Sequence, residues 1–228
     1  TPMTIISGYV DGMLDGTVPK NKRMQYLSIV SQEMQRLKIL ISSMLNLTKF
    51  DNGTIEIHYQ LFPIQDLAFR TILMFESRLE KRNITLEGLD SEPVQVWGDP
   101  DLIGQVIYNL FENATKFVNT GGTITFTFKD EPNSTSIAIR NTGAGISKEE
   151  LPKIFERFYK SDDSRSHDKT GLGIGLDITK HIVRLHKAQI SVSSEEGEYT
   201  EFLIRLPKKD APAESPTENP EKQPKDAR

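Results

Sequence analysis

Two heptad stripes lie within about the first 50 residues and leave few alternatives to a pair of packed helices. In both stripes the apolar residues recur at alternating spacings of three and four, which places them on one face of an α-helix. Between the stripes, residues 15–19 (D-G-T-V-P) contain a glycine and a proline, which end helices and let the chain reverse. The pattern predicts a helical hairpin that ends at Asp51-Asn52-Gly53. The stripes consist of Met3, Ile6, Val10 and Met13, then Leu27, Val30, Met34, Leu37, Ile41, Met44 and Thr48.

Each of these helices carries more apolar residues than two helices can hide from water. A hairpin from a second copy of the chain would cover the surplus in a four-helix bundle, so we expect a homodimer. The alternative is that the surplus packs on the following domain of the same chain. The residues beside the two seams are Ile5, Tyr9, Leu14, Leu40, Leu45 and Leu47.

Beyond the hairpin, the pattern changes to short β-type runs mixed with amphipathic helices. Turn signals such as N-T-G-G (119–122) separate the later strands, which favours a largely antiparallel, mixed sheet covered by helices on one face. The predicted fold class is therefore α+β, with a helical hairpin followed by an α/β sandwich. Strands are expected at 54–58, 84–87, 94–97, 123–129, 134–140, 189–194 and 200–206, and helices at 64–82, 99–117, 148–156 and 175–186.

The composition divides the chain further and excludes several classes of protein. Residues 208–228 contain no aromatic residue, valine, isoleucine or leucine, so we expect a disordered tail after domains at 1–52 and 53–207. The absence of cysteine excludes disulfides and is compatible with a reducing compartment. A net charge of −4 argues against direct nucleic-acid binding. Without an apolar run of membrane-spanning length or a signal-peptide pattern, we expect no transmembrane segment and no export signal in these residues.

The first element whose residues could bind a ligand is N-L-F-E-N-A-T-K-F, within the helix expected at 99–117. Asn109, Asn113 and Lys116, or alternatively Glu112 with the latter two, lie on adjoining turns of one helix. Amide oxygens suit Mg²⁺ and a lysine one turn further suits phosphate oxygens, although polar residues at this spacing also form ordinary solvated faces.

The second element is N-T-G-A-G-I, which begins at Asn141 as a predicted strand ends. Gly143 and Gly145 let the backbone bend sharply and approach a ligand closely, and an ordinary glycine turn is the alternative.

The remaining two elements flank a polar stretch. I-F-E-R-F-Y opens it, and its aromatic residues Phe155, Phe158 and Tyr159 suit a core. G-L-G-I-G-L closes it immediately before an amphipathic helix whose N-terminal amides would receive phosphate groups. The stretch between them is expected to form a mobile lid. The glycine spacing fits neither a dinucleotide-binding fingerprint nor a P-loop.

Taken in order, the four elements resemble the N, first glycine, F and second glycine boxes of the sensor histidine kinases of two-component systems. Their ATP-binding domain has the Bergerat fold, shared with gyrase and the Hsp90 chaperones. The hairpin resembles the family's dimerisation and phosphotransfer helices, so the likeness covers residues 1–207.

The resemblance implies ATP and Mg²⁺ as cofactors and gives roles to individual residues. Asn113 would bind Mg²⁺ with Asn109 in support, Lys116 would contact phosphate, and Phe117 would lie near adenine. In related ATPases a glutamate at the place of Asn109 activates water, which an amide cannot do. The glycines at 143 and 145 would shape the adenine pocket, and the lid would be flanked by Gly171, Gly173 and Gly175.

The resemblance also bears on two arginines and the first residue. Arg157 and Arg165 are expected either to contact phosphate or to have no role toward the nucleotide, being merely solvated or paired with nearby acids. Thr1 matches the family position that orients water for dephosphorylation of the partner response regulator.

Two departures from the family pattern affect the expected chemistry. Asn141 stands where the family has an aspartate that accepts a hydrogen bond from adenine, and losing the charge would weaken binding by about 1 to 2 kcal/mol. The family's phosphoacceptor motif, H-E-x-x-[TN]-P, would place its histidine about one helical turn before Thr1, so the chain is expected to begin just after it. The four histidines present, expected to be surface or partly packed side chains, are His58, His167, His181 and His186.

The function expected from this resemblance is transfer of the ATP γ-phosphate to histidine and onward to an aspartate of a response regulator. The expected location is the cytoplasmic part of a membrane-anchored bacterial sensor. A serine kinase of the anti-sigma type is one alternative, which the heptad hairpin disfavours. A non-catalytic dimeric docking or nucleotide-sensing module is the other, and Asn141 would then be a sign of lost activity.

Overall fold

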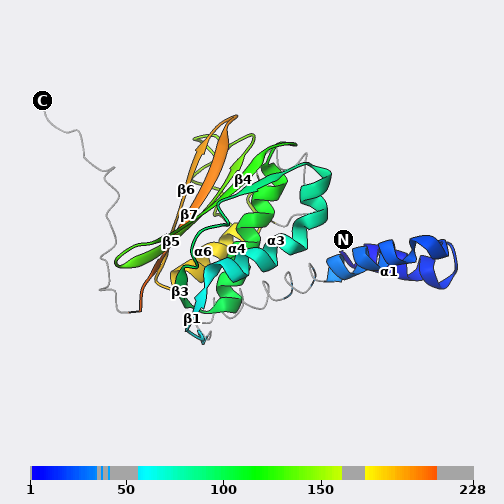
Figure 1. The fold of residues 1–228 in the computed structure, drawn as a ribbon. Coiled ribbons are helices and arrows are strands. Elements are labelled where there is room, and N and C mark those ends of the chain that lie inside the picture. The colour runs from blue at the N-terminus through cyan, green and yellow to red at the C-terminus, as the bar shows by residue number, and fades with distance from the viewer. Residues whose placement is uncertain (1, 35–36, 38–40, 42–55, 161–172, 210–228) are drawn as a thin grey trace, which may run out of the picture.

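The computed structural model describes residues 2–34, 37, 41, 56–160 and 173–209 (Figure 1). Its first element is the helix α1 (Pro2–Leu14), followed by the 3₁₀ turn η1 (Lys20–Lys22) and a helical segment over 24–34. The predicted break between two helices is confirmed, and Tyr9 stacks on Tyr26 across it with ring centroids 4.8 Å apart. The end of the hairpin at 51–53 lies outside the described residues.

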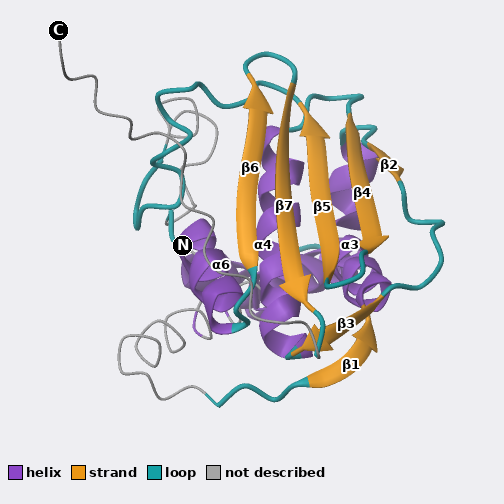
Figure 2. Ribbon diagram, turned by 90° about the vertical axis from the view of Figure 1, so that its left-hand side faces the viewer, coloured by secondary structure: helices purple, strands orange, loops and turns teal. Residues whose placement is uncertain are grey.

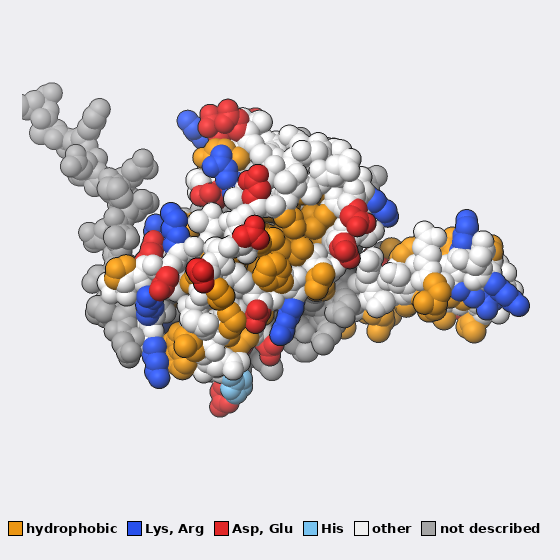
Figure 3. All heavy atoms as spheres, viewed as in Figure 1, with side chains coloured by type: hydrophobic (Ala, Val, Ile, Leu, Met, Phe, Trp, Pro, Cys, Tyr) orange, Lys and Arg blue, Asp and Glu red, His pale blue; other side chains and the backbone are white. Residues whose placement is uncertain are grey.

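The apolar residues of the hairpin remain accessible to solvent. Leu14 is 81% exposed, Met24 78% and Met3 67%, and hydrophobic side chains are visible over the surface of the hairpin (Figure 3). Exposed apolar stripes of this kind are what a two-helix unit shows when its covering partner is not present. Among the described helices, none has the length and hydropathy needed to cross a membrane.

A five-stranded sheet forms the body of the second domain (Figure 2). Its strand order is β2-β4-β5-β7-β6, with β2 parallel to β4 and every other neighbouring pair antiparallel. The helices cover one face of it (Figure 2), so the predicted mixed sheet with one covered face is confirmed. The strands are β2 (Thr85–Glu87), β4 (Thr123–Asp130), β5 (Ser134–Thr142), β6 (Gln189–Glu195) and β7 (Tyr199–Pro207).

Three helices supply the other half of the core: α3 (Ile64–Lys81), α4 (Pro100–Phe117) and α6 (Gly175–Leu185). In α4 the apolar residues of one stripe reach the sheet, and Phe111 meets Phe126 of β4 with ring centroids 5.5 Å apart. Both rings are almost fully buried. Each such side chain contributes about 1.5 to 3 kcal/mol to folding, which fixes α4 against the sheet.

Two predicted elements are wrong. The described part of the strand expected at 54–58 is not extended in a sheet; the strand β1 (Gln60–Pro63) begins later and pairs antiparallel with β3 (Gln95–Gly98). The helix expected at 148–156 is instead a series of turns, in which amides such as that of Lys153 bond three residues back. Pro152 supplies no amide hydrogen, and Phe158 adopts a φ of 65°, so the series does not continue as an α-helix.

His186 is not the surface or partly packed residue that was expected. Its ring is 2% exposed, Nε2 accepts a hydrogen bond from the Asp99 amide at 3.1 Å, and Nδ1 donates to the Ile182 carbonyl at 2.8 Å. This arrangement requires the neutral imidazole. Burial lowers the pKa of His186 below 6.5, although the bond to Ile182 and the carboxylate of Asp99 act in the opposite direction.

The stability of the domain should therefore fall as the pH decreases through about 6.5. In that range the unfolded chain binds a proton at His186 that the folded chain does not bind, and the free energy of unfolding decreases. Chemical denaturation between pH 8 and pH 5 measures this slope. In a His186→Gln variant the slope should be shallower; equal slopes in both proteins would contradict the assignment.

Candidate nucleotide-binding site

Asn109 connects two of the four predicted elements. It lies on α4, is 6% exposed, and donates from Nδ2 to the Gly175 carbonyl at 3.0 Å and to Thr179 Oγ1 at 3.3 Å. The Thr179 hydroxyl donates to the same Gly175 carbonyl at 2.9 Å. The amide of Asn109 is thus used to hold the first turn of α6 against α4, next to the second glycine element.

Asn113 lies one turn further along α4 and is half-buried. Within the described part of the chain, no hydrogen bond to its side chain is present. Lys116 lies beside it on the helix and forms an ion pair with Glu112 at 3.3 Å. In the same part of the chain, no three His, Cys, Asp or Glu side chains gather into a metal site. With Asn113 as a ligand, a Mg²⁺ ion would combine this amide oxygen with oxygens of the nucleotide, a donor set of the kind that Mg²⁺ accepts.

The end of β5 meets the end of α4. A backbone bridge joins Val118 to Gly143, and the Gly143 amide donates to the Glu198 carbonyl at 3.0 Å. Gly143 has a φ of 150°, and a Cβ there would overlap the carbonyl oxygen of Phe117. The Phe117 ring is 37% exposed, so a partly open aromatic surface lies beside the first glycine element.

Asn141 lies at this same end of β5 and is 3% exposed. Its Nδ2 donates to the carbonyl of Thr142 at 3.1 Å, which fixes the orientation of the amide. Two residues after Gly143, Gly145 has a φ of 70°, and a Cβ there would overlap the carbonyl oxygen of Glu195. These two glycines are required by close backbone approaches, not only by a turn.

Both ends of the segment expected to be a lid meet each other. The Phe158 amide donates to the Gly173 carbonyl at 3.0 Å, and Gly173 has a φ of 68°. Arg157 Nε donates to Asp177 Oδ2 at 3.0 Å, so of its two expected roles the structure shows pairing with an acid. Phe158 is 70% exposed and is not a core residue, in contrast to the expectation. Thr1, Arg165, Gly171 and the segment 161–172 lie outside the described residues.

The N-terminus of α6 has properties that favour an anion. Ile174 occupies the capping position, and its apolar side chain makes no capping hydrogen bond. The amides there carry the positive end of the helix dipole. Asp177 adds one negative charge in the first turn, but its two oxygens lie close to Arg157 and to His181 Nδ1, at 3.0 and 3.3 Å.

Sequence reasoning missed Thr179 and Asp177, which organise this helix end. A signal for Thr179 was present, because it follows Gly175 by one turn and a threonine hydroxyl often bonds the carbonyl at i−4. The pairing of Asp177 with Arg157 joins residues that are 20 positions apart, and no local pattern indicates it.

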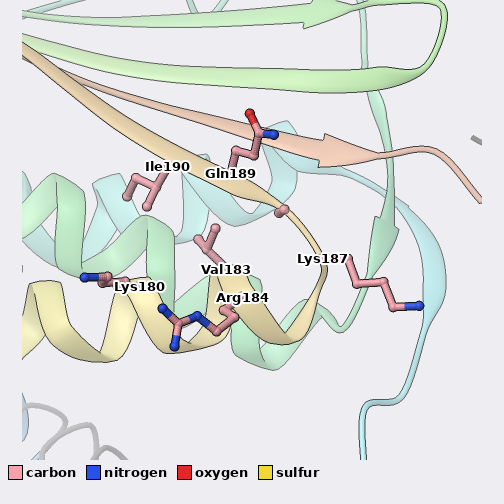
Figure 4. Close-up of a pocket in the computed structure, with 7 residues that line it drawn as sticks. Lys180, Val183, Arg184, Lys187, Gln189 and Ile190 are labelled. Carbon is pink, nitrogen blue, oxygen red and sulfur yellow. The ribbon is translucent and has the colours of Figure 1, made fainter. Parts of the chain in front are cut away.

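A separate groove between α6 and the start of β6 contains none of these residues (Figure 4). Its basic side chains, Lys180, Arg184 and Lys187, do not converge on a common point. The apposed ends of α4, β5 and α6 are therefore the place where the predicted residues gather.

This combination of fold and site defines an ATP-binding domain of the class described as histidine kinase-, DNA gyrase B- and HSP90-like ATPase, which residues 98–210 match. Residues 1–53 match the His Kinase A (phospho-acceptor) domain. The chain belongs to the sensor histidine kinases of two-component systems, and it comprises their catalytic portion.

Relatives of known sequence or structure agree with this assignment. The chain is 32% identical over 210 residues to the sensor protein SrrB of Staphylococcus aureus, covering 91% of this chain and 36% of that protein. It thus spans about a third of the relative's length. The catalytic domain of histidine kinase ThkA is 27% identical, with a TM-score of 0.57 over 66% of this chain and 95% of that chain. Histidine kinase AdeS of Acinetobacter baumannii shares the fold, with a TM-score of 0.63 over 91% of this chain and 95% of that chain at 23% identity.

Proposed function

We propose that this chain catalyses transfer of the ATP γ-phosphate to a histidine nitrogen, from which the phosphoryl group passes to an aspartate of a response regulator. The observation that carries the proposal is the contact between predicted elements. The Asn109–Gly175 hydrogen bond and the Val118–Gly143 bridge bring three of them together along the C-terminal half of one helix, α4. The division into 1–52, 53–207 and a tail at 208–228 belongs to the same proposal and is supported by the two matched ranges.

Within this site each side chain would act by position and charge. Asn113 would bind a Mg²⁺ ion, which would neutralise charge that develops on the phosphates. Lys116 would leave its partner Glu112 to contact phosphate, and the amides in the first turn of α6 would also contact phosphate. The Phe117 ring would lie against adenine beside Asn141.

The role proposed for Arg157 has a contact in the structure behind it, whereas those of Arg165 and Thr1 come from the family resemblance alone. Arg157 would act by holding Asp177 and the first turn of α6, since this is the contact that it makes. Arg165 as a phosphate contact and Thr1 as an aid to dephosphorylation stay predictions from the family resemblance.

The partners and location follow from the same family. We propose a homodimer through the hairpin, supported by its exposed apolar stripes and by the match to the phospho-acceptor domain. A response regulator is the second partner; ThkA, a structural neighbour with a TM-score of 0.58, was solved in complex with the response regulator TrrA. We place the chain on the cytoplasmic side of a membrane-anchored sensor.

Mg²⁺-dependent binding of a non-hydrolysable ATP analogue is the direct test. Calorimetric titration should show binding that EDTA weakens, and Asn113→Ala should weaken it by about tenfold or more, because its amide is the proposed metal ligand. Asn133→Ala, in the exposed turn between β4 and β5, is the matched control and should bind like the unsubstituted chain. An unsubstituted chain that does not bind at millimolar analogue would contradict the kinase proposal and favour the non-catalytic docking module, for which Asn141 is the supporting feature.

A further inference from the structure

Tyr59 lies in the connection between the hairpin and the second domain and is held by three neighbours. Its ring stacks on Trp97 of β3 with centroids 5.8 Å apart, and it meets the edge of His186 at 5.5 Å. Its hydroxyl donates to the carbonyl of Leu185 at 3.4 Å. Burial and the nearby carboxylate of Asp99 raise the pKa of Tyr59. We name Tyr59, Trp97, Asp99 and His186 the linker clasp.

Asp99 is the centre of the linker clasp and is 6% exposed. Its Oδ1 caps α4 by accepting from the amides of Asp101 at 3.0 Å and Leu102 at 3.2 Å, while Oδ2 accepts from the amide of His58 at 2.9 Å. Its own amide donates to His186 Nε2. One carboxylate thus bonds the start of α4 and the incoming linker at the same time.

The packing around Asp99 leaves little freedom for these groups to move separately. A Cβ on the preceding Gly98 would overlap the Ile103 side chain and would stand 3.2 Å from the His186 ring. Because interiors are close-packed, a displacement of the linker here must be accommodated by α4 or by the end of α6.

The two helices at the clasp are the ones that carry the candidate nucleotide site. Asp99 is the N-cap of α4, which carries Asn113, and α6 begins at Gly175 and has His186 as its C-cap. At the site itself the two helices are joined again by the hydrogen bond from Asn109 to Gly175. Two rigid elements therefore connect the linker clasp to the site, each fixed at both of its ends.

We propose that Tyr59 is a positioning residue through which docking of the linker and binding of nucleotide are coupled. This inference rests on the proposed function, since it needs a nucleotide at the apposed ends of α4, β5 and α6. Coupling is reciprocal: if the docked linker favours nucleotide binding, bound nucleotide must stabilise the docked linker by the same free energy. The geometry of the segment that joins the hairpin to the catalytic domain would thus regulate the nucleotide site.

Both directions of the coupling are measurable on the full 228-residue chain. Tyr59→Ala should weaken binding of the non-hydrolysable ATP analogue in the presence of Mg²⁺ by about fivefold or more. Tyr59→Phe keeps the ring contacts and should restore affinity. Leu61→Ala, at a position two residues away that is 62% exposed on β1, is the matched control and should leave affinity unchanged. In the unsubstituted chain, the analogue should slow hydrogen exchange of the amides in 56–63.

The outcomes separate this inference from the proposed function. Failure of the unsubstituted chain to bind the analogue would contradict the proposed function and this inference with it. If the unsubstituted chain binds the analogue, either of two results would overturn the coupling alone. One is an equal affinity in Tyr59→Ala, and the other is hydrogen exchange over 56–63 that the analogue does not change. If Tyr59 had a merely structural role, Tyr59→Ala would speed hydrogen exchange over 56–63, but the ATP analogue would not change that exchange in the unsubstituted chain. If Tyr59→Ala does not fold, as circular dichroism would show, the exchange measurement on the unsubstituted chain still decides.

Discussion

The 228-residue polypeptide, incubated with Mg²⁺ and γ-labelled ATP, is expected to accumulate no acid-labile phosphohistidine. Phosphoryl transfer needs a nucleophile held in line with the γ-phosphate, and the family's nucleophile is an imidazole within the motif H-E-x-x-[TN]-P. These 228 residues contain no histidine in such a motif. Adding a segment that supplies the motif immediately before Thr1 should therefore restore labelling.

The structure gives a reason why one of the described histidines cannot substitute. His186 is buried, and both of its ring nitrogens are engaged in hydrogen bonds. His58 is exposed, but it lies in the linker held by Asp99. The control is the same extension with glutamine in place of its histidine, which should stay unlabelled. Robust labelling of the unextended polypeptide, mapped to a histidine within it, would show that the acceptor is misassigned.

The elements of the fold were predictable where the local sequence pattern is sufficient to determine the structure. The apolar stripe of α4, and the short β-type runs bounded by turn signals at β4, β5 and β7, predicted the types of these elements and, within a few residues, their ends. The breaking residues at 15–19 likewise predicted the reversal between two helices. In each case short-range periodicity and backbone preference agree with the tertiary packing.

Sequence reasoning failed where contacts between distant segments decide the structure. The apolar pattern at 148–156 suggested a helix, but Pro152 and the bond between Phe158 and Gly173 favour turns. The burial of His186 depends on Asp99, which lies 87 positions earlier, and no local pattern indicates it.

The same limit applies to the candidate site. The four elements were identified from the sequence, and three of them meet at α4. The fourth, I-F-E-R-F-Y, contacts Gly173 and the first turn of α6. Asn109 donates hydrogen bonds to Gly175 and Thr179, and Arg157 donates one to Asp177. These bonds depend on how α6 packs against the rest of the domain, which no local sequence pattern indicates. The roles of these residues toward a nucleotide stay predictions.

Substitution of Gly143 by alanine is expected to damage both stability and nucleotide binding. The new Cβ would overlap the carbonyl oxygen of Phe117, so the end of β5 and the end of α4 would have to separate. An alanine at a positive φ costs about 1 to 2 kcal/mol, and overpacking adds about 1 to 3 kcal/mol, which together lower the melting temperature by roughly 4 to 20 °C for a domain of this size.

Gly121→Ala separates the steric effect from the backbone strain. Gly121 also has a positive φ, 74°, but a Cβ there would meet nothing within 4 Å. The control should therefore show the strain alone, with a smaller loss of melting temperature and unchanged affinity for the ATP analogue. For Gly143→Ala we expect affinity to fall by about tenfold or more, since separating β5 from α4 moves Asn141 away from Phe117 and opens the place proposed for adenine. If the two variants lost equal stability and both bound the analogue normally, the contact between Gly143 and Phe117 would not be part of the nucleotide site.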